Sequence, residues 1–391
     1  MAGLPEPRNP SWAHGDWTVA TERKVSYRVT LLERLLDHDN SALMTAAVPP
    51  GDPVNRALIV ADSTVEARYG AEIRSYFAHH DMPCEMFALP VSEPGKTIER
   101  VTAVVDAFDE FRVARGETVV AFGGGVLLDV VGLAASLYRR GTAHVRVPTT
   151  LVGLVDAGIG AKTGVNHGDG KSRLGAYHPP REVLLDRTFL RTLDRRHITN
   201  GVAEILKMAI VADERLFRLL EEHGPALVEE RFQGNTPTSD GAAGEVLARA
   251  ISGMLTELAG NLWEHQLERI VDYGHSVSPL IEMLALPELL HGEAVAIDMA
   301  LFAVLSARRG LLAAADRDRI LAVLRGLGLP VSHPLLEISV LSRALAETTR
   351  HRGGRQRLPI PVKIGAARMF SDVSDDELAL AAKELGSENA G

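Results

Sequence analysis

The sequence of 391 residues contains a single cysteine, Cys84. One cysteine excludes an intrachain disulfide and a cysteine-rich zinc site, and it fits a reducing compartment such as the cytoplasm. A bound metal would therefore need histidine and carboxylate ligands. Long hydrophobic runs are also missing, because Asp129 and Arg139 interrupt the most apolar stretches, 118–128 and 130–138. These runs fall well short of the roughly 18 residues that a membrane span needs, so we expect no membrane insertion.

An excess of positive charge is absent as well. Lys and Arg number 42 against 51 Asp and Glu, a formal net charge of -9. This balance argues against general binding to nucleic acid or anionic membranes, so an anionic ligand would need a local basic pocket. The apolar fraction of 46% and charged fraction of 24% are typical of globular proteins. At roughly 150 residues a domain, we expect two or three domains.

The sequence pattern divides the chain into three segments. Residues 1–25 carry Pro5, Pro7 and Pro10 and lack the apolar core of a signal peptide, so we expect an irregular arm. Residues 26–190 alternate short β-branched runs with amphipathic stretches, which is typical of βαβ units around a parallel sheet. The expected strands are 57–61, 83–89, 118–122 and 145–147, and the expected helices are 66–79 and 97–115.

Residues 191–391 show apolar residues at three- and four-residue spacing, which predicts a helical domain. The clearest runs are 203–222, 243–258, 294–308 and 316–327. Segment 231–241 is rich in Gly, Pro, Ser and Thr and is expected to be a surface loop. The predicted fold class is an α/β domain followed by an all-α domain, with a ligand cleft between them.

A glycine run, Gly123 to Gly125, directly follows an apolar strand and precedes a helical stretch. Such a turn lets backbone N–H groups approach a pyrophosphate, and the helix N-terminus favours its charge. The run lacks the GxGxxG spacing, so a plain tight turn is an equal alternative. Asp62 and Glu93 follow the two preceding strands and could accept ribose hydroxyls, although each could also be a solvated loop acid or a helix cap.

Segment 148–171 sets Asp156, Lys162 and Lys171 among six glycines. Its two ammonium groups could meet phosphate, whereas the alternative is an irregular loop with surface lysines. A P-loop is excluded, because Val165 stands where that motif has its first glycine.

Three scattered residues, Glu204, His275 and His291, form a familiar catalytic zinc set if the fold brings them together. Lone histidines are more often core or capping residues, and His291 could simply cap a helix. Glu204 and Lys207 lie three residues apart and share a helix face, where an exposed ion pair is the alternative to a role in the cleft.

Several motifs occur in a fixed order between Gly123 and Ile297: GGGVLLDVVG, YRRG, VPTTLVGLVDAGIGAKTGVN, TLDRRHITNGVAEILK and HGEAVAI. Together they resemble the dehydroquinate synthase superfamily, the sugar phosphate cyclases, from about Ala57 to about Gly365. The resemblance implies an N-terminal Rossmann-like parallel-sheet domain that binds NAD. It also implies a C-terminal helical domain with one divalent metal, zinc or cobalt, in the cleft.

The resemblance also implies roles for individual residues. The metal ligands would be Glu204, His275 and His291. The residues that match the family's NAD contacts are Asp62, Glu93, Lys96, Gly124, Gly125, Asp129, Thr149, Thr150, Lys171, Phe189 and Thr192. Asp156, Lys162 and Lys207 match residues around the substrate. Arg140, in YRRG, matches an arginine that completes the site of a neighbouring subunit, which implies a homodimer.

The chain departs from the dehydroquinate synthases at the substrate. Met254 and Glu268 stand where those enzymes have a lysine and an arginine beside the substrate's carboxylate. Losing two cations and gaining an acid disfavours a carboxylated substrate. Four further positions differ. Ser172 and Asp272 each stand where those enzymes have an asparagine. Pro279 replaces a histidine, and His351 replaces a late lysine.

This combination resembles the branch that cyclises sedoheptulose 7-phosphate to 2-epi-5-epi-valiolone for C7-cyclitol natural products. The implied reaction is transient oxidation by NAD+, phosphate elimination, reduction and an intramolecular aldol step. Asp272 would accept hydroxyl hydrogen bonds, and Arg140, Lys162 and His351 would hold the phosphate. The alternatives are a 2-epi-valiolone or desmethyl-4-deoxygadusol synthase, a 3-dehydroquinate synthase, a metal-dependent polyol dehydrogenase and a catalytically silent relative.

Overall fold

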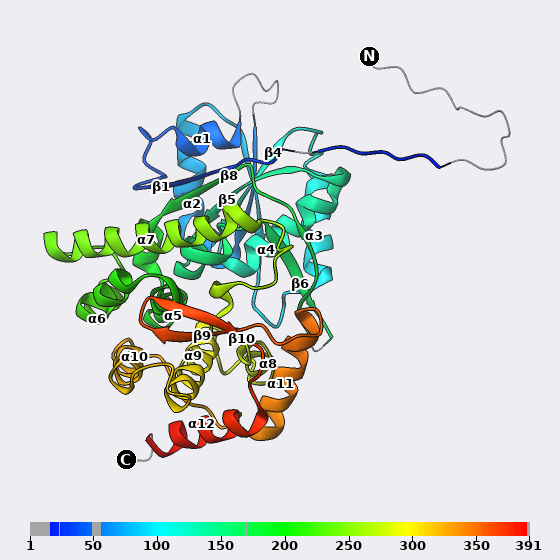
Figure 1. The fold of residues 1–391 in the computed structure, drawn as a ribbon. Helices are drawn as coiled ribbons and strands as arrows, with labels where there is room; N and C mark the ends of the chain where they lie inside the picture. Colours follow the sequence, from blue (N-terminus) through cyan, green and yellow to red (C-terminus); the bar gives the residue numbers. More distant parts are fainter. Residues whose placement is uncertain (1–15, 23, 49–55, 169, 389–391) are drawn as a thin grey trace.

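A six-stranded parallel sheet forms the frame of the first half of the chain (Figure 1). The computed structural model describes residues 16–22, 24–48, 56–168 and 170–388. The strand order is β1-β8-β5-β4-β2-β3, so the first strand lies beside the last one of the sheet. The strands are β1 (Arg28–Leu32), β2 (Ala57–Asp62), β3 (Cys84–Leu89), β4 (Thr118–Gly123), β5 (Ala143–Pro148) and β8 (Glu182–Asp186).

Helices cover both faces of this sheet, because alternate side chains of each strand point to opposite faces. Ile59 of β2 belongs to a core shared with α1 (Ala42–Ala47) and α2 (Ser63–His79). Leu58 belongs to a second core, shared with α3 (Ile98–Glu110) and α4 (Gly125–Leu137). Burial on both faces explains why the central strands are continuously apolar. The expected strands and helices of this half are present, and the helix expected over 97–115 ends earlier, at Glu110.

Segment 148–171 is regular and not the irregular loop of the alternative, although Lys162 is a surface lysine as that alternative expected. A π-helical turn, η2 (Gly153–Ala157), is followed by an antiparallel hairpin of β6 (Lys162–His167) and β7 (Gly170–Tyr177). The glycines permit close backbone packing here: a Cβ atom at Gly158 would lie 2.3 Å from the Gly153 carbonyl oxygen.

After η3 (Arg187–Thr192) the chain becomes helical. The helices are α5 (Arg195–Ala212), α6 (Glu214–Glu229), α7 (Pro237–Asn261), α8 (Ser278–Leu284), α9 (His291–Arg308), α10 (Ala314–Gly326), α11 (Ile338–His351) and α12 (Asp375–Glu388). Most of α9 is buried, so this helix is the centre of the second core. None of the helices in the described ranges combines the length and the apolar character that crossing a membrane requires.

Three expectations for this half need correction. The helical run 203–222 is broken at Asp213, whose carboxylate accepts the Leu216 N–H at 3.0 Å and starts α6. The loop expected over 231–241 ends at Thr236, because Thr236 and Ser239 form a capping box that starts α7. The domain is not all-α, since β9 (Leu358–Lys363) and β10 (Ala366–Phe370) form an antiparallel hairpin.

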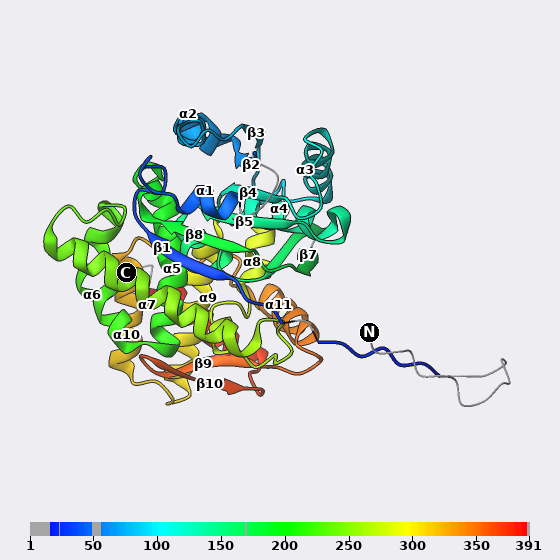
Figure 2. The same ribbon diagram turned by 90° about the horizontal axis from the view of Figure 1, so that it is seen from above.

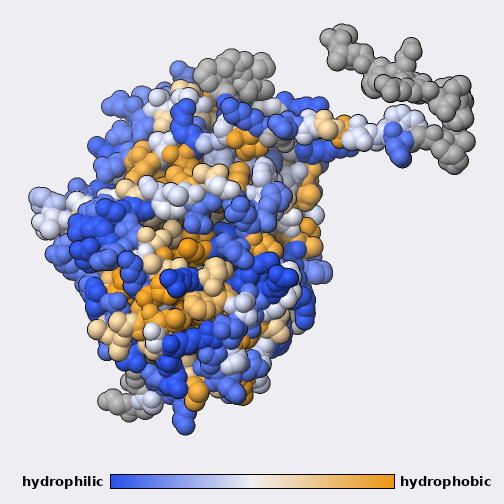
Figure 3. Space-filling model, viewed as in Figure 1, coloured by the Kyte–Doolittle hydropathy of each residue, from blue (hydrophilic) through white to orange (hydrophobic). Residues whose placement is uncertain are grey.

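The described part of the N-terminal arm has no regular secondary structure before β1. It extends away from the body in both views (Figures 1 and 2). Trp17 and Val19 are 83% and 94% exposed. Residues 1–15 of the expected arm lie outside the described residues. On the face of the body shown in Figure 3, apolar patches interrupt a mainly polar surface across the middle.

Candidate active site

A cavity of about 1310 Å³ lies between the carboxyl ends of the sheet strands and the helices of the second half. All the residues predicted to contact NAD line it, together with Asp156, His275, His291 and His351. Glu204 and Lys207 are buried directly behind its histidines. Arg140, Lys162 and Asp272 are not among the residues that line it.

The sheet end of the cavity is built from helix N-termini, a buried ion pair and a glycine turn. Asp62 caps α2 by accepting the Thr64 N–H at 2.7 Å. α4 begins at Gly125, and a Cβ atom at Gly124 would lie 2.9 Å from Cγ2 of Thr150. Gly124 and Gly125 line the cavity at the start of α4, and a helix N-terminus favours the charge of a pyrophosphate.

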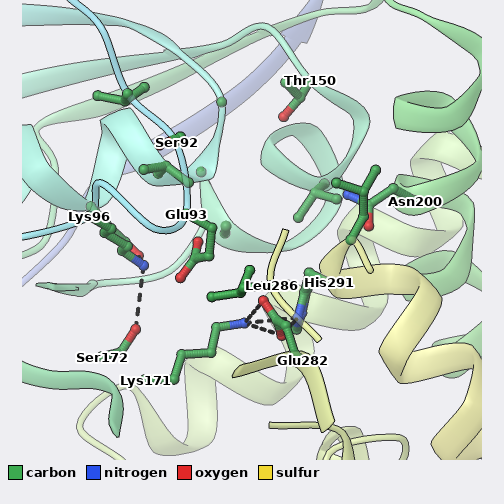
Figure 4. A pocket seen from close by; sticks show the side chains of 18 of the residues that line it. Ser92, Glu93, Lys96, Thr150, Lys171, Ser172, Asn200, Glu282, Leu286 and His291 are labelled. Carbon is green, nitrogen blue, oxygen red and sulfur yellow. Dashed lines mark hydrogen bonds and ion pairs between the residues drawn. The ribbon is translucent and has the colours of Figure 1, made fainter. Parts of the chain in front are cut away.

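The buried ion pair joins Lys96 to Asp129, with 2.6 Å between Nζ and Oδ2. Burial lowers the pKa of Lys96, but Asp129 and Glu93 more than compensate, so its pKa is raised above the usual value. Glu93 accepts the Asn166 side-chain amide at 3.0 Å, which fixes the carboxylate near Lys96 (Figure 4). The site thus presents one ammonium and two carboxylates toward a ligand.

The three predicted metal ligands come together. One ligand atom from each of Glu204, His275 and His291 lies within 4.8 Å of the other two. Glu204 Oε1 is 3.2 Å from Nε2 of His291 and 3.8 Å from Nε2 of His275. The alternatives are wrong: His291 is the first residue of α9 and Leu290 is its N-cap, and both histidines line the cavity. One carboxylate and two imidazoles are the donor set of a catalytic zinc site.

The Nδ1 atom of each histidine lies within hydrogen-bond distance of a protein oxygen, which orients its Nε2 atom toward Glu204. His275 Nδ1 is 3.2 Å from the Tyr273 carbonyl oxygen. His291 Nδ1 is 2.8 Å from Oε2 of Glu282, a buried carboxylate on α8 that also pairs with Lys171 at 2.6 Å (Figure 4). Burial and the nearby Lys207 lower the pKa of His275 to about 3, so its imidazole is neutral and able to bind a metal.

Lys207 and Glu204 form a buried pair, with 2.6 Å between Nζ and Oε2 and side-chain exposures of 3% and 1%. The exposed ion pair considered for these residues is therefore wrong. Burial lowers the pKa of Lys207, but Glu204 and Asp156 raise it above the usual value, so the ammonium stays charged. Burial raises the pKa of Asp156, which favours the protonated carboxyl. Lys207 and Asp156 thus place a cation and a carboxyl group with a raised pKa beside Glu204.

The predicted phosphate and hydroxyl contacts are more scattered. Lys162 is 60% exposed and forms an ion pair with Glu264, and Arg140 is exposed on η1 (Tyr138–Arg140). His351, at the end of α11, lines the cavity. Asp272 pairs with Arg352, with 3.4 Å between Oδ2 and Nη2.

Two residues expected at the carboxylate end of a substrate lie elsewhere. Met254 is buried in the core of the helical half, and Glu268 is exposed near Arg357, so neither lines the cavity. Glu282 and Arg352 are two residues near the site that were not predicted from the sequence. Glu282 is the only acid in the apolar stretch of α8, which is the one signal that could have revealed it.

A parallel sheet whose strand ends face a cavity, joined to a helical half that carries a Glu–His–His cluster, defines a nucleotide- and metal-dependent enzyme. The chain belongs to the 3-dehydroquinate synthase family. Residues 86–200 match the model of its N-terminal domain, and residues 201–351 match that of its C-terminal domain.

Several of its relatives are 2-epi-5-epi-valiolone synthases. The chain is 54% identical to a 2-epi-5-epi-valiolone synthase of Actinomyces sp., over 94% of this chain and 97% of the relative. It is 40% identical to the demethyl-4-deoxygadusol synthase of Trichormus variabilis, over 92% and 87% of the two chains. The solved structure of the 2-epi-5-epi-valiolone synthase ValA from Streptomyces hygroscopicus subsp. jinggangensis, with NAD+ and Zn2+ bound, superposes with a TM-score of 0.89. The two chains are 52% identical, and the match covers 95% of this chain and all of that one.

Proposed function

We propose that this chain cyclises sedoheptulose 7-phosphate to 2-epi-5-epi-valiolone and releases phosphate. The observation that carries this proposal is the identity of 54% to a synthase of that product over nearly the whole of both chains. The cavity agrees with it, because the residues predicted to contact NAD line it together with the metal ligands His275 and His291.

The proposal includes NAD and one divalent metal, zinc or cobalt. Glu204, His275 and His291 would hold the metal, and their donor atoms and spacing fit it. When bound, NAD accepts and returns a hydride at C5 of the sugar and the metal polarises the carbon–oxygen bond that is oxidised. Asp62 and Glu93 would bind hydroxyl groups of the cofactor, and the N-terminus of α4 would bind its pyrophosphate.

Proton movement is assigned to Asp156 and Lys207. Asp156 lies in the cavity wall, and burial raises its pKa, which favours proton exchange with the reacting sugar. Lys207 keeps its charge beside Glu204 and would stabilise negative charge that develops on a substrate oxygen. Asp272, anchored by Arg352, would accept hydrogen bonds from substrate hydroxyls.

The phosphate is assigned to His351, Lys162 and Arg140 of a second subunit. His351 already lines the cavity. Lys162 would have to leave Glu264 to reach a phosphate, and its exposure leaves room for that movement. Arg140 is exposed and does not line this chain's cavity, so a neighbouring copy would be the one to use it. We therefore propose a homodimer that acts in the cytoplasm, as the single cysteine favours.

The dimer can be tested by mixing two variants. Arg140→Ala removes only the arginine that one subunit contributes to its partner's site. Lys207→Met disables only the site of the subunit that carries the substitution. Co-expression should restore part of the turnover, because a mixed dimer keeps one complete site. No recovery from two variants that form mixed dimers would contradict the shared site.

The activity is tested by incubating the protein with sedoheptulose 7-phosphate, NAD+ and Zn2+ or Co2+, with the dehydroquinate synthase substrate in parallel. Phosphate release and product NMR follow the reaction. We expect a 2-epi-5-epi-valiolone spectrum and no accumulation of NADH, because the cofactor is regenerated. A different cyclitol spectrum would identify a sister synthase, and stoichiometric NADH would indicate a dehydrogenase.

A further inference from the structure

The two histidines of the proposed metal site come from separate elements. His275 lies in the turn between η4 (Ile270–Asp272) and α8, and His291 begins α9. Their ring centroids are 5.3 Å apart. A metal site needs its ligands held close to their bound geometry before the metal arrives, so something must fix this turn against α9.

A buried carboxylate on α9 makes that connection. Asp298 lies seven residues after His291, almost two turns along the same helix, so both residues share one face. Its Oδ2 accepts the backbone N–H groups of Ser276, Val277 and Ser278 at 2.8, 2.6 and 2.8 Å. These three residues directly follow His275.

Burying this carboxylate costs folding free energy. Asp298 is completely buried, and within the described chain its Oδ1 has no hydrogen-bond partner. Burial raises the pKa of Asp298 to about 6, although the three N–H groups and Arg352 act in the opposite direction. A fold that needed only to cap this turn could do so with a neutral serine or asparagine, which desolvates no charge.

We propose that Asp298 is a positioning residue for the metal site. Its carboxylate locks the turn that carries His275 onto the helix that carries His291. Three charge-assisted hydrogen bonds to consecutive N–H groups leave the turn little freedom to rotate, and therefore hold His275 Nε2 toward Glu204. Asp298 touches neither histidine and acts only through the backbone. This inference rests on the metal site of the proposed function.

The test compares zinc affinities of metal-free proteins by chelator competition, well below their melting temperatures. Asp298→Ala should weaken zinc binding by about tenfold or more, the usual effect of losing a group that orients a ligand. Asp298→Asn keeps an acceptor oxygen of the same shape without the charge, and should fall between Asp298→Ala and the wild type. With Co2+ in place of zinc, the visible absorption of Asp298→Ala should change, because the coordination geometry changes.

Asp186 provides a matched control. It is also a buried carboxylate that accepts two backbone N–H groups, from Leu35 and Thr188 at 2.7 and 2.8 Å. Asp186→Ala should therefore lose stability in a similar way but keep zinc affinity. Equal weakening in both alanine variants would show a general loss of stability and overturn the proposal.

Each remaining outcome is also decisive. Zinc affinity of Asp298→Ala within twofold of the wild type would overturn the proposal. If Asp298→Ala does not fold, Asp298→Asn decides, and wild-type affinity in that variant would overturn it. Failure of the wild-type protein to bind zinc would instead contradict the proposed metal site itself.

Discussion

The contact between α5 and α9 at Gly292 predicts a large effect from one added methyl group. Gly292 follows His291, and its N–H donates to Oδ1 of Asn200 at 2.5 Å. A Cβ atom at Gly292 would lie 2.1 Å from the Asn200 carbonyl oxygen, 1.3 Å short of the 3.4 Å at which ordinary contacts begin. The obstacle is backbone, so Gly292→Ala must push the start of α9 away from α5, one turn from Glu204.

The consequence for the site can be estimated. Overpacking of this kind costs about 1–3 kcal/mol of folding free energy. A displacement of about 1 Å between Glu204 and His291 should lower turnover about 100-fold and weaken zinc binding. The measurements are thermal unfolding, zinc competition and phosphate release from sedoheptulose 7-phosphate.

Gly241 supplies the control. It is an exposed glycine in α7, and a Cβ atom there would meet nothing within 4 Å. Gly241→Ala should keep full activity and gain up to about 1 kcal/mol of stability, because alanine favours helix. If Gly292→Ala were folded and kept wild-type zinc affinity and turnover, the reasoning from the α5–α9 contact would be refuted.

Three further predictions concern the substrate, the metal and the cysteine. Asp272→Asn should lower phosphate release at least tenfold, because the neutral amide is a weaker acceptor and loses its attraction to Arg352; unchanged turnover would contradict the role of Asp272. Removing metal with a chelator should abolish turnover and lower the melting temperature, and added Zn2+ or Co2+ should restore both; full activity in demonstrably metal-free protein would exclude the metal site. Burial raises the pKa of Cys84 to about 11, so iodoacetamide should alkylate it slowly at pH 8 and faster as the pH rises toward 11. Reaction at pH 8 as fast as that of free cysteine would show that Cys84 is more exposed than in this structure.

The sequence predicted the parts of the fold that depend on local patterns. The strand 118–122 was predictable because an apolar run ends in glycines, and the same glycines marked the start of α4. The hairpin β9–β10 was missed because its strand 358–363 contains Pro359 and Pro361, which argue against a strand. The start of α7 was missed because its first turn consists of Pro, Ser, Thr and Asp, residues that also make loops.

The same distinction holds at the site. Glu204, His275 and His291 could be chosen because metal binding restricts residue types, and the motifs restricted their positions. Glu282 and Asp298 could not be chosen, because acids within helices are common and only the fold brings these two against His291 and the turn after His275. Lys162 matched a motif, yet its ion pair with Glu264 depends on the packing of a hairpin against a distant loop.

The place of β1 has a consequence for the synthesis of the protein. β1 pairs along its length with β8, so Arg28 lies opposite Glu182, and Asp186 accepts the Leu35 N–H. The sheet therefore cannot be completed until more than 150 further residues have left the ribosome, which takes about 8–30 s at about 5–20 residues per second. During that interval the first strand has no partner, and the nascent chain must keep it from pairing elsewhere.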